Sequence, residues 1–246
     1  MSVIMSKVFT IPIVGTAASD LAVGSSVWLN VNGTLTEFLV VHQGNPDASM
    51  YDNSCDGTWL LMKDIYTKSP WNTSDNNDYS QSDVHFYLNT TFLNLFDAET
   101  QAQIKTVKIP YAAGYPSSEV NTGTNGLSTK IFLLSSYEAG LIRSGAGYGE
   151  YDYVPVDGVC LSYFKDTVSG YELTKAYYNG VATEWFHRSI DDRNNYCCMA
   201  SRENGHFDIA YTTGDSIDLS GYGIRPALIL PPNAKFDPDT MEFVEV

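Results

Sequence analysis

Apolar and polar residues alternate in two bursts across residues 8–41, and this period of two predicts half-buried β-strands. The second burst contains Asn32 and Gly33 between two apolar runs, and this dipeptide is the strongest short signal for a β-hairpin. Residues 57–66 form another apolar run of strand length, which leads into a polar loop. The first part of the chain is therefore expected to build strands.

A helical period follows. Apolar residues recur every three or four positions across residues 83–96, directly after Ser82, a residue type that caps helix N-termini. Asp97 then opens a second short stretch of good helix formers over residues 98–105. The pattern predicts two helices in this part of the chain.

The pattern of residue types changes again in the second half of the chain. Ser135 and Glu138 have the spacing of a capping box, in which the two side chains satisfy each other's backbone amides. From residue 145 onward, short strand candidates alternate with Gly, Asn and Asp. Helices in the first half, many short strands in the second and no βαβ rhythm predict an α+β domain.

Composition and charge restrict the classes of function. The 246 residues are 43% apolar and 17% charged, with 17 Tyr and 19 Gly, which is a globular composition rich in aromatic contact surface. The net charge of −15 leaves no basic stripe of the kind that nucleic-acid-binding proteins carry, and it opposes docking on anionic lipid. We therefore expect no nucleic-acid partner.

The N-terminal segment and the cysteines indicate where the chain is made. The first apolar stretch is broken by Pro12 and predicts a strand rather than a signal peptide, and no run approaches the roughly 20 apolar residues of a membrane span. These features predict a protein made in a cytoplasm, without membrane insertion. Its cysteines are then expected to be free thiols. They are Cys55, Cys160, Cys197 and Cys198.

Residues 185–198, WFHRSIDDRNNYCC, contain most residue types that a metal or a catalytic centre uses. Cys197 and Cys198 are adjacent, so along a strand their side chains point to opposite faces and do not easily share one ion. The chain has no CxxC and no HExxH motif. We therefore predict no metal site among these residues.

Residues 71–83, WNTSDNNDYSQSD, are rich in oxygen ligands and suggest Ca²⁺. They lack the alternating acidic spacing and the distal Glu of an EF-hand loop. Asn, Asp and Ser before a helix more often satisfy turn backbone and cap the helix. No cofactor is predicted, and Ca²⁺ at this loop stays open.

Nucleophilic catalysis has little support. The chain has no G-x-S-x-G elbow and no phosphate-binding or dinucleotide-binding loop. The remaining nucleophiles are Cys197 and Cys198, with His187 or His206 as the base. The sequence therefore predicts a protein that is not an enzyme.

A binding surface explains the residue types at 185–211 better than a metal site or a catalytic centre does. Tyr, Arg, Asn, Ser and Asp are the residue types that binding loops use, because they combine contact area with adaptable hydrogen bonds. We expect the ligand-binding residues to be exposed on one face, with Arg193, Tyr196 and Tyr211 contributing most. The predicted ligand-binding face is formed by Asp191, Asp192, Arg193, Asn194, Asn195, Tyr196, Asn204, His206, Asp208 and Tyr211.

Two motifs suggest a family. A Trp-x-x-Arg-Ser segment formed by Trp185, Arg188 and Ser189, followed by the closing Gly-Ile-Arg-Pro-Ala-Leu strand at 223–228, resembles the end of a C-type-lectin-like domain. This family is related to the formylglycine-generating-enzyme fold and is common in gut bacteria and their phages. The resemblance covers roughly residues 25–232.

The resemblance implies a C-type-lectin-like α+β fold with two or more helices and many short, mostly antiparallel strands. An N-terminal strand-forming arm (1–24) and a C-terminal tail (233–246) would flank the domain. The scaffold residues would be Trp185, Arg188, Ser189 and Arg225. Trp and Arg would be partly buried anchors, and Arg225 would be paired or hydrogen-bonded inside the domain.

The function implied is that of a non-enzymatic binding or display protein, specifically a phage virion component such as a capsid decoration, fibre or tail-tip protein. It would be made in the host bacterial cytoplasm. Its partners would be other virion subunits, including further copies of itself, and a glycan or protein of the host surface. Two alternatives stay open: a bacterial surface adhesin module, and a formylglycine-generating-type oxidase that uses Cys197 or Cys198.

Overall fold

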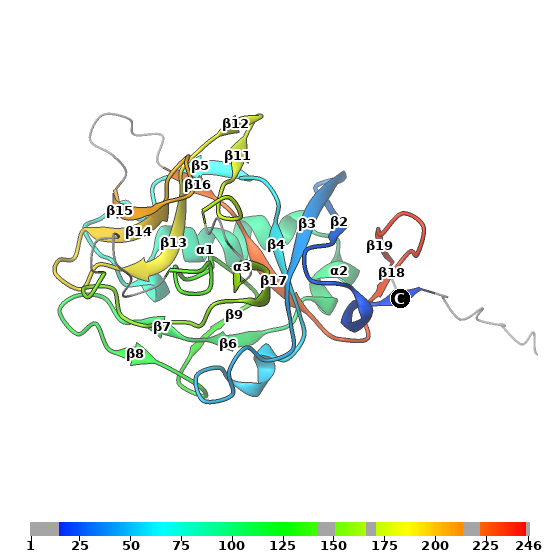
Figure 1. The fold of residues 1–246 in the computed structure, drawn as a ribbon, viewed down its shortest axis with the longest axis horizontal. Helices are drawn as coiled ribbons and strands as arrows, with labels where there is room; N and C mark the ends of the chain where they lie inside the picture. The colour runs from blue at the N-terminus through cyan, green and yellow to red at the C-terminus, as the bar shows by residue number, and fades with distance from the viewer. Residues whose placement is uncertain (1–14, 142–150, 166–170, 214–221, 245–246) are drawn as a thin grey trace, which may run out of the picture.

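The computed structural model describes residues 15–141, 151–165, 171–213 and 222–244. In this part of the chain the structure has nineteen strands, of two to ten residues each, and three α-helices of four to six residues (Figure 1). The fold is therefore mostly β, and the predicted α+β class is wrong. Among these residues, no helix has both the length and the apolar character needed to cross a lipid bilayer.

The predicted helical segments exist, but they are short and irregular. Helix α1 (Asp83–Tyr87) begins at Ser82, whose hydroxyl accepts a hydrogen bond from the His85 amide, and it continues into a π-turn and a 3-10 turn. Helix α2 (Ala98–Gln103) is capped by Asp97. Strands form in both halves of the chain, and this is why the class predicted from the order of the elements is wrong.

One five-stranded sheet runs through the centre of the molecule in the order β10-β17-β4-β3-β2, with every neighbouring pair antiparallel. The predicted hairpin between β2 and β3 is confirmed, and its turn residues Asn32 and Gly33 both have positive φ. The strands are β2 (Ser26–Val31), β3 (Thr34–Gln43), β4 (Thr58–Met62), β10 (Ile131–Phe132) and β17 (Ala227–Leu230).

Strand β4 shows why this sheet is covered on both faces. Leu60 and Met62 pack into one hydrophobic cluster together with the helical segment, and Trp59 and Leu61 pack into a second cluster. Successive side chains on a strand point to opposite faces, so an uninterrupted apolar run supplies both clusters. The core is therefore divided by the sheet.

A second five-stranded sheet has the order β15-β14-β13-β16-β5, and the predicted binding residues lie on β15 and in the connections between β13, β14 and β15. Its pairs are antiparallel except for the parallel pair of β13 and β16. Strand β14 lies inside the sheet, whereas β15 forms its edge. The strands are β5 (Thr67–Ser69), β13 (Trp185–Ile190), β14 (Cys197–Ser201), β15 (Phe207–Tyr211) and β16 (Tyr222–Ile224).

Smaller elements surround these sheets. A three-stranded sheet in the order β1-β18-β19 joins the two ends of the described chain, to the right in Figure 1. The other strands form three antiparallel pairs, β6 with β9, β7 with β8, and β11 with β12. The bounds are β1 (Thr16–Ala17), β6 (Val107–Ile109), β7 (Tyr111–Ala112), β8 (Val120–Asn121), β9 (Leu127–Thr129), β11 (Tyr177–Tyr178), β12 (Val181–Ala182), β18 (Lys235–Phe236), β19 (Phe243–Val244) and helix α3 (Ser162–Lys165).

The three-stranded sheet draws its residues from the segments predicted as the arm and the tail. Ala18 and Leu21 from the arm and Phe236 from the tail are buried in the hydrophobic cluster that also contains the helical segment. These parts of the two segments therefore pack onto the domain. Residues 1–14 of the predicted arm lie outside the described residues.

Candidate binding surface

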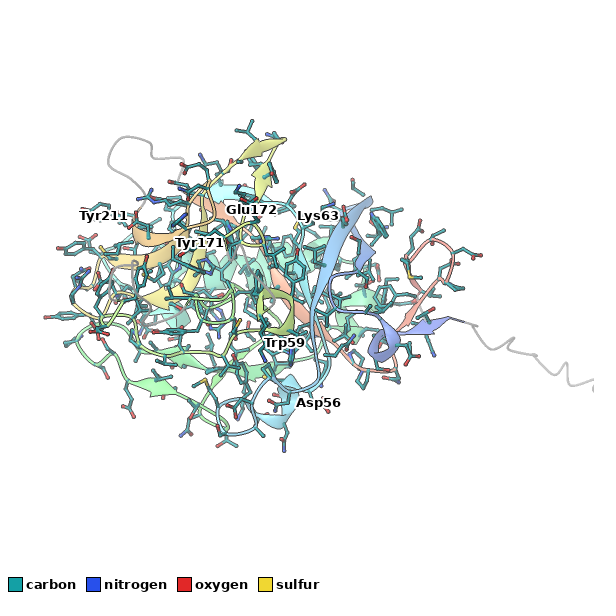
Figure 2. The ribbon with its side chains drawn as sticks, viewed as in Figure 1. Asp56, Trp59, Lys63, Tyr171, Glu172 and Tyr211 are labelled. Carbon is teal, nitrogen blue, oxygen red and sulfur yellow. The ribbon has the colours of Figure 1, made fainter. Side chains whose placement is uncertain are left out.

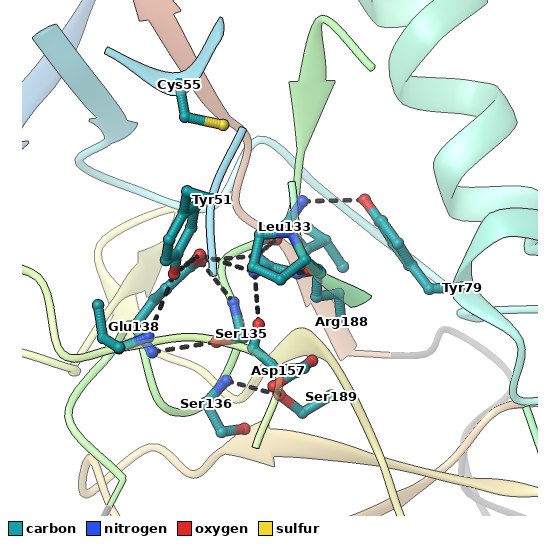
Figure 3. Close-up of polar contacts among 12 residues, drawn as sticks. Tyr51, Cys55, Tyr79, Leu133, Ser135, Ser136, Glu138, Asp157, Arg188 and Ser189 are labelled. Carbon is teal, nitrogen blue, oxygen red and sulfur yellow. Dashed lines mark hydrogen bonds and ion pairs between the residues drawn. The ribbon is translucent and has the colours of Figure 1, made fainter. Parts of the chain in front are cut away.

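The second sheet is anchored by a fully buried arginine on β13. The Arg188 guanidinium donates to both carboxylate oxygens of Glu138 at 2.6 Å (Figure 3). Its remaining N–H groups donate to the carbonyl oxygens of Pro110, Leu133 and Asp157 at 2.9, 3.0 and 3.0 Å. All five donors of the side chain are satisfied, which offsets much of the cost of removing the charge from water.

Glu138 is held in turn by its own neighbours. Its carboxylate accepts hydrogen bonds from the Tyr51 hydroxyl at 2.7 Å and from the Ser135 amide at 2.9 Å. The Ser135 hydroxyl accepts a hydrogen bond from the Glu138 amide, so the predicted capping box is confirmed. The capping residue is thus also the counter-ion of Arg188.

Ser189 extends the network to a second carboxylate. Its hydroxyl donates to Asp157 Oδ1 at 2.8 Å and accepts from the Ser136 amide at 2.9 Å. Asp157 Oδ2 has no hydrogen-bond partner among the described residues, and burial raises the pKa of this carboxyl to about 6. The Arg and the Ser of the Trp-x-x-Arg-Ser element therefore build a closed interior, and none of the network's side chains is free to contact a ligand.

Trp185 and Arg225 form a second buried contact. The indole N–H of Trp185 donates to the Thr174 carbonyl at 2.7 Å, and the Arg225 guanidinium lies 4.9 Å from the centre of the indole. Arg225 also donates to the Met62 carbonyl, which is the internal hydrogen bond predicted for it. Burial lowers the pKa of Arg225 to about 10. Trp185 and Arg188 are fully buried, so their predicted partial exposure is wrong.

His187, a candidate base, is also inside. Its Nε2 lies 2.8 Å from the Ser201 hydroxyl oxygen, and its Nδ1 has no partner among the described residues. Burial lowers the pKa of this imidazole to about 3, so the ring is neutral at physiological pH. The candidate nucleophiles Cys197 and Cys198 are buried on β14, and burial raises the pKa of both thiols. A thiol of raised pKa is a weak nucleophile.

In the loop that follows β13, one of the predicted binding residues is buried. Asp191 is 1% exposed, so its predicted exposure is wrong. Its two carboxylate oxygens accept from the Arg193 guanidinium at 2.9 and 2.7 Å. Arg193 also lies 3.5 Å from the centre of the Tyr153 ring, while about half of its side chain stays exposed. Asp191 therefore orients Arg193, and Arg193 is the residue that meets solvent.

Asn77 holds this loop from the inside. Its amide nitrogen lies 2.9–3.0 Å from the carbonyl oxygens of Asp191, Asn194 and Cys197, and its own oxygen accepts from the Tyr115 amide at 2.9 Å. The side chain is completely buried. Sequence reasoning missed this role, because Asn77 is one of several similar residues in the stretch that suggested Ca²⁺.

That stretch otherwise caps turns. Asp78 accepts hydrogen bonds from the amide and the hydroxyl of Ser80, and Asp83 accepts from the amide and the hydroxyl of Thr73. Among the residues with described positions, no three His, Cys, Asp or Glu side chains come together in a way that could hold a metal ion. The Asp side chains of this loop therefore stabilise its backbone.

Two exposed tyrosines lie at one end of the β14–β15 hairpin. Tyr196 is 44% exposed and Tyr211 is 51% exposed, and their rings stack with centres 6.0 Å apart and planes inclined by 18°. Tyr211 lies near the left end of the molecule in Figure 2. Together with the exposed side chains of Arg193 and Asn195 we call these residues the tyrosine patch.

The other predicted residues lie elsewhere. Asn204 and His206 are exposed in the turn at the opposite end of the hairpin, where His206 stacks on Tyr171 with ring centres 3.7 Å apart. Strand β15 separates the two ends by about 13 Å, at roughly 3.3 Å per residue. Asp208 and Tyr211 are three residues apart, so their side chains leave opposite faces of the strand. The predicted single face is wrong.

The two remaining predicted residues, Asp192 and Asn194, are half-buried. The Asp192 amide donates to the Tyr153 carbonyl, and the Asn194 side chain accepts from the Tyr196 amide. Both contacts add to the support of the loop behind the tyrosine patch. The patch therefore retains four of the ten predicted binding residues, and it includes the three that were expected to contribute most.

These features define a mostly β scaffold domain, with a closed polar interior at its centre and aromatic side chains exposed at one end. The chain belongs to the DUF6273 family, a domain of unknown function, which matches residues 56–232. This span includes the Arg188–Glu138 pair and the tyrosine patch, whereas Tyr51, which donates to Glu138, lies just before it. No curated protein and no solved structure matches the chain.

Proposed function

We propose that the protein is a non-enzymatic binding or display protein and that the tyrosine patch is its ligand-binding face. The observation that carries the proposal is the stacked, exposed pair of Tyr196 and Tyr211 beside a loop held by the buried Asn77. Exposed aromatic pairs on a supported backbone are typical of binding hot spots.

Preorganisation strengthens this interpretation. Tyrosine offers a large contact area and a hydroxyl with few rotatable bonds, so little side-chain entropy is lost on binding. Arg193 is held against Asp191 and Tyr153 and still exposes about half of its side chain. A ligand would therefore meet a cation and two aromatic rings whose supports are already in place.

The motif resemblance to C-type-lectin-like domains supports a more specific proposal, that of a phage virion component such as a capsid decoration, fibre or tail-tip protein. Its ligand would be a glycan or a protein of the host surface. A bacterial surface adhesin module is the alternative of the same binding class. The burial of Cys197 and Cys198 supports a binding role over an oxidase.

The test compares two sets of exposed tyrosines. The double substitution Tyr196→Ala and Tyr211→Ala should weaken binding of the labelled protein to bacterial cells or immobilised glycans by about 30-fold or more. The free energy of unfolding should change by less than about 0.5 kcal/mol per site. Tyr177→Ala on β11 is the matched control, because Tyr177 is 43% exposed and lies outside the patch. Equal losses in both variants would contradict the proposal.

Electron microscopy of purified particles, with an antibody against this chain, tests the virion assignment separately. Label on the particle surface is the expected result. Label confined to the bacterial envelope would favour the adhesin, while the tyrosine patch would keep its role.

A further inference from the structure

A third segment of the chain reaches the end of the molecule that carries the tyrosine patch. It is the turn between β7 and β8, which lies at the left of Figure 1 together with the loop between β13 and β14. Tyr115 in this turn is 47% exposed. Sequence reasoning gave Tyr115 no role, because the turn lies far from residues 185–211 along the chain.

The buried side chain of Asn77 joins this turn to the loop behind the patch. The Tyr115 amide donates to Asn77 Oδ1 at 2.9 Å, and the amide nitrogen of the same side chain lies 2.9 Å from the Asn194 carbonyl oxygen. A Cβ at Gly114 would lie 2.8 Å from the backbone nitrogen of Asp78, so the turn also packs closely against the segment around Asn77. One buried amide therefore sets the position of the Tyr115 backbone relative to the patch.

Asp75 belongs to the same surface. Asn195 of the patch donates to the Asp75 carbonyl oxygen at 2.8 Å. The Asp75 side chain is exposed, and its carboxylate has no partner among the described residues. Residues 75–78 thus contact the patch on one side and the turn of Tyr115 on the other, and they connect the two.

We propose that Tyr115 and Asp75 extend the tyrosine patch and that the ligand of the extended face is a protein. Tyr115 adds an aromatic contact from a separate segment, and Asp75 meets a lysine or arginine of the partner. This inference rests on the proposed binding role of the tyrosine patch.

The spread of the tyrosines favours a protein over a glycan. Tyr196 and Tyr211 come from one hairpin and Tyr115 from another turn, and all three are exposed. A single sugar ring covers about one aromatic side chain, so a larger surface is needed to cover the three together. Tyrosine and arginine are also the residue types that are enriched where proteins meet.

The charge of the face points in the same direction. The Arg193 guanidinium is already paired with Asp191, whereas the Asp75 carboxylate is exposed without such a partner among the described residues. The excess charge beside the patch is therefore negative. A negative face repels anionic polysaccharides and attracts a basic protein surface.

The first test measures binding of full-length variants to whole bacterial cells by flow cytometry. Tyr115→Ala should raise the apparent dissociation constant about 10-fold or more, and Tyr115→Phe should restore most of the affinity, because the ring supplies the contact. The midpoint of urea denaturation should stay unchanged, because the side chain is exposed. Tyr177→Ala is the matched control, since Tyr177 is 43% exposed and lies on β11.

The second test reverses a charge. Asp75→Arg should weaken binding to the same cells about 10-fold or more, and the loss should be smaller at high salt, which screens exposed charges. Asp239→Arg is the matched control, because Asp239 is an exposed carboxylate in the turn between β18 and β19, at the right of Figure 1. If Tyr115→Ala lowers the denaturation midpoint, Asp75→Arg decides the matter.

Treatment of the cells identifies the class of partner. Protease should abolish binding, and periodate, which oxidises glycans, should leave it intact; the reverse result would overturn the protein assignment. Binding that is lost in the double variant Tyr196→Ala and Tyr211→Ala but kept in Tyr115→Ala and Asp75→Arg would overturn this inference alone. Wild type that binds no cells, or binding kept by the double variant, would overturn the proposed function and this inference with it.

Discussion

The guanidinium of Arg188 and the carboxylate of Glu138 meet through two hydrogen bonds of 2.6 Å, and neither side chain has any exposed surface. The pair joins β13 to a segment fifty residues earlier in the chain. Strand β13 leads directly into the loop that supports the tyrosine patch. The buried pair therefore holds in place the strand that leads into the loop of the proposed binding surface.

Replacing Arg188 should destabilise the fold strongly. Arg188→Met leaves the Glu138 carboxylate buried without its cation and should cost about 3–5 kcal/mol of the free energy of unfolding, measured by urea denaturation. Lys63→Met is the control, because both Lys63 and its partner Glu37 keep part of their side chains in solvent, and it should cost about 1 kcal/mol or less. If the two losses were equal, the buried pair would not have the role assigned to it.

Replacing Asn77 should loosen the loop behind the tyrosine patch. Asn77→Ala removes the donor shared by three carbonyl oxygens and should cost about 2 kcal/mol. Hydrogen exchange should accelerate at residues 191–197, and ligand binding should weaken. Asn195→Ala removes one exposed hydrogen bond to Asp75 and should leave exchange in this loop almost unchanged.

Two glycines with positive φ allow the cost of backbone strain to be measured separately from the cost of a steric collision. A Cβ at Gly205 would lie 1.8 Å from the Tyr171 carbonyl oxygen, whereas nothing lies within 4 Å of a Cβ at Gly180. Gly180→Ala should cost about 1 kcal/mol for the left-handed conformation alone. Gly205→Ala should cost more than about 3 kcal/mol, because the backbone must move, and thermal melting of both variants measures the difference.

The buried carboxyl of Asp157 should make stability depend on pH. Its pKa of about 6 in the folded state lies above the ordinary 3.8, so the folded protein binds the proton more tightly than the unfolded chain does. The resulting stabilisation is present below about pH 4 and is lost as the pH rises through 6. Relative to Asp157→Asn, the free energy of unfolding of wild type should fall by up to about 3 kcal/mol between pH 4 and 6, as measured by urea denaturation.

Asp47→Asn provides a control for which the pH dependence of stability should have the opposite sign. Hydrogen bonds from the hydroxyl and the amide of Ser49 lower the pKa of the exposed Asp47 carboxyl. Wild type should therefore gain stability relative to Asp47→Asn as the pH rises through the acid range. A pH profile of the same sign for both variants would contradict the assignment for Asp157.

Local features were predictable from the sequence. The Asn32-Gly33 turn, the cap at Ser82 and the Ser135–Glu138 capping box involve residues at most three positions apart, where side-chain and backbone preferences decide the structure. The fold class was not predictable in the same way. Short strands become strands only when partners from elsewhere in the chain complete their hydrogen bonds, and six of the thirteen strand pairs among the described residues join strands that are not consecutive in the chain.

The sequence by itself determined that residues 185–211 would hold both buried and exposed polar groups, and Arg193, Tyr196 and Tyr211 are indeed exposed. Only the tertiary structure decided which polar groups face inward. Asp191 is buried, and its backbone carbonyl accepts a hydrogen bond from the buried side chain of Asn77, 114 residues earlier. Exposure depends on what packs over a residue, and such contacts between distant segments leave no periodic signal in the sequence.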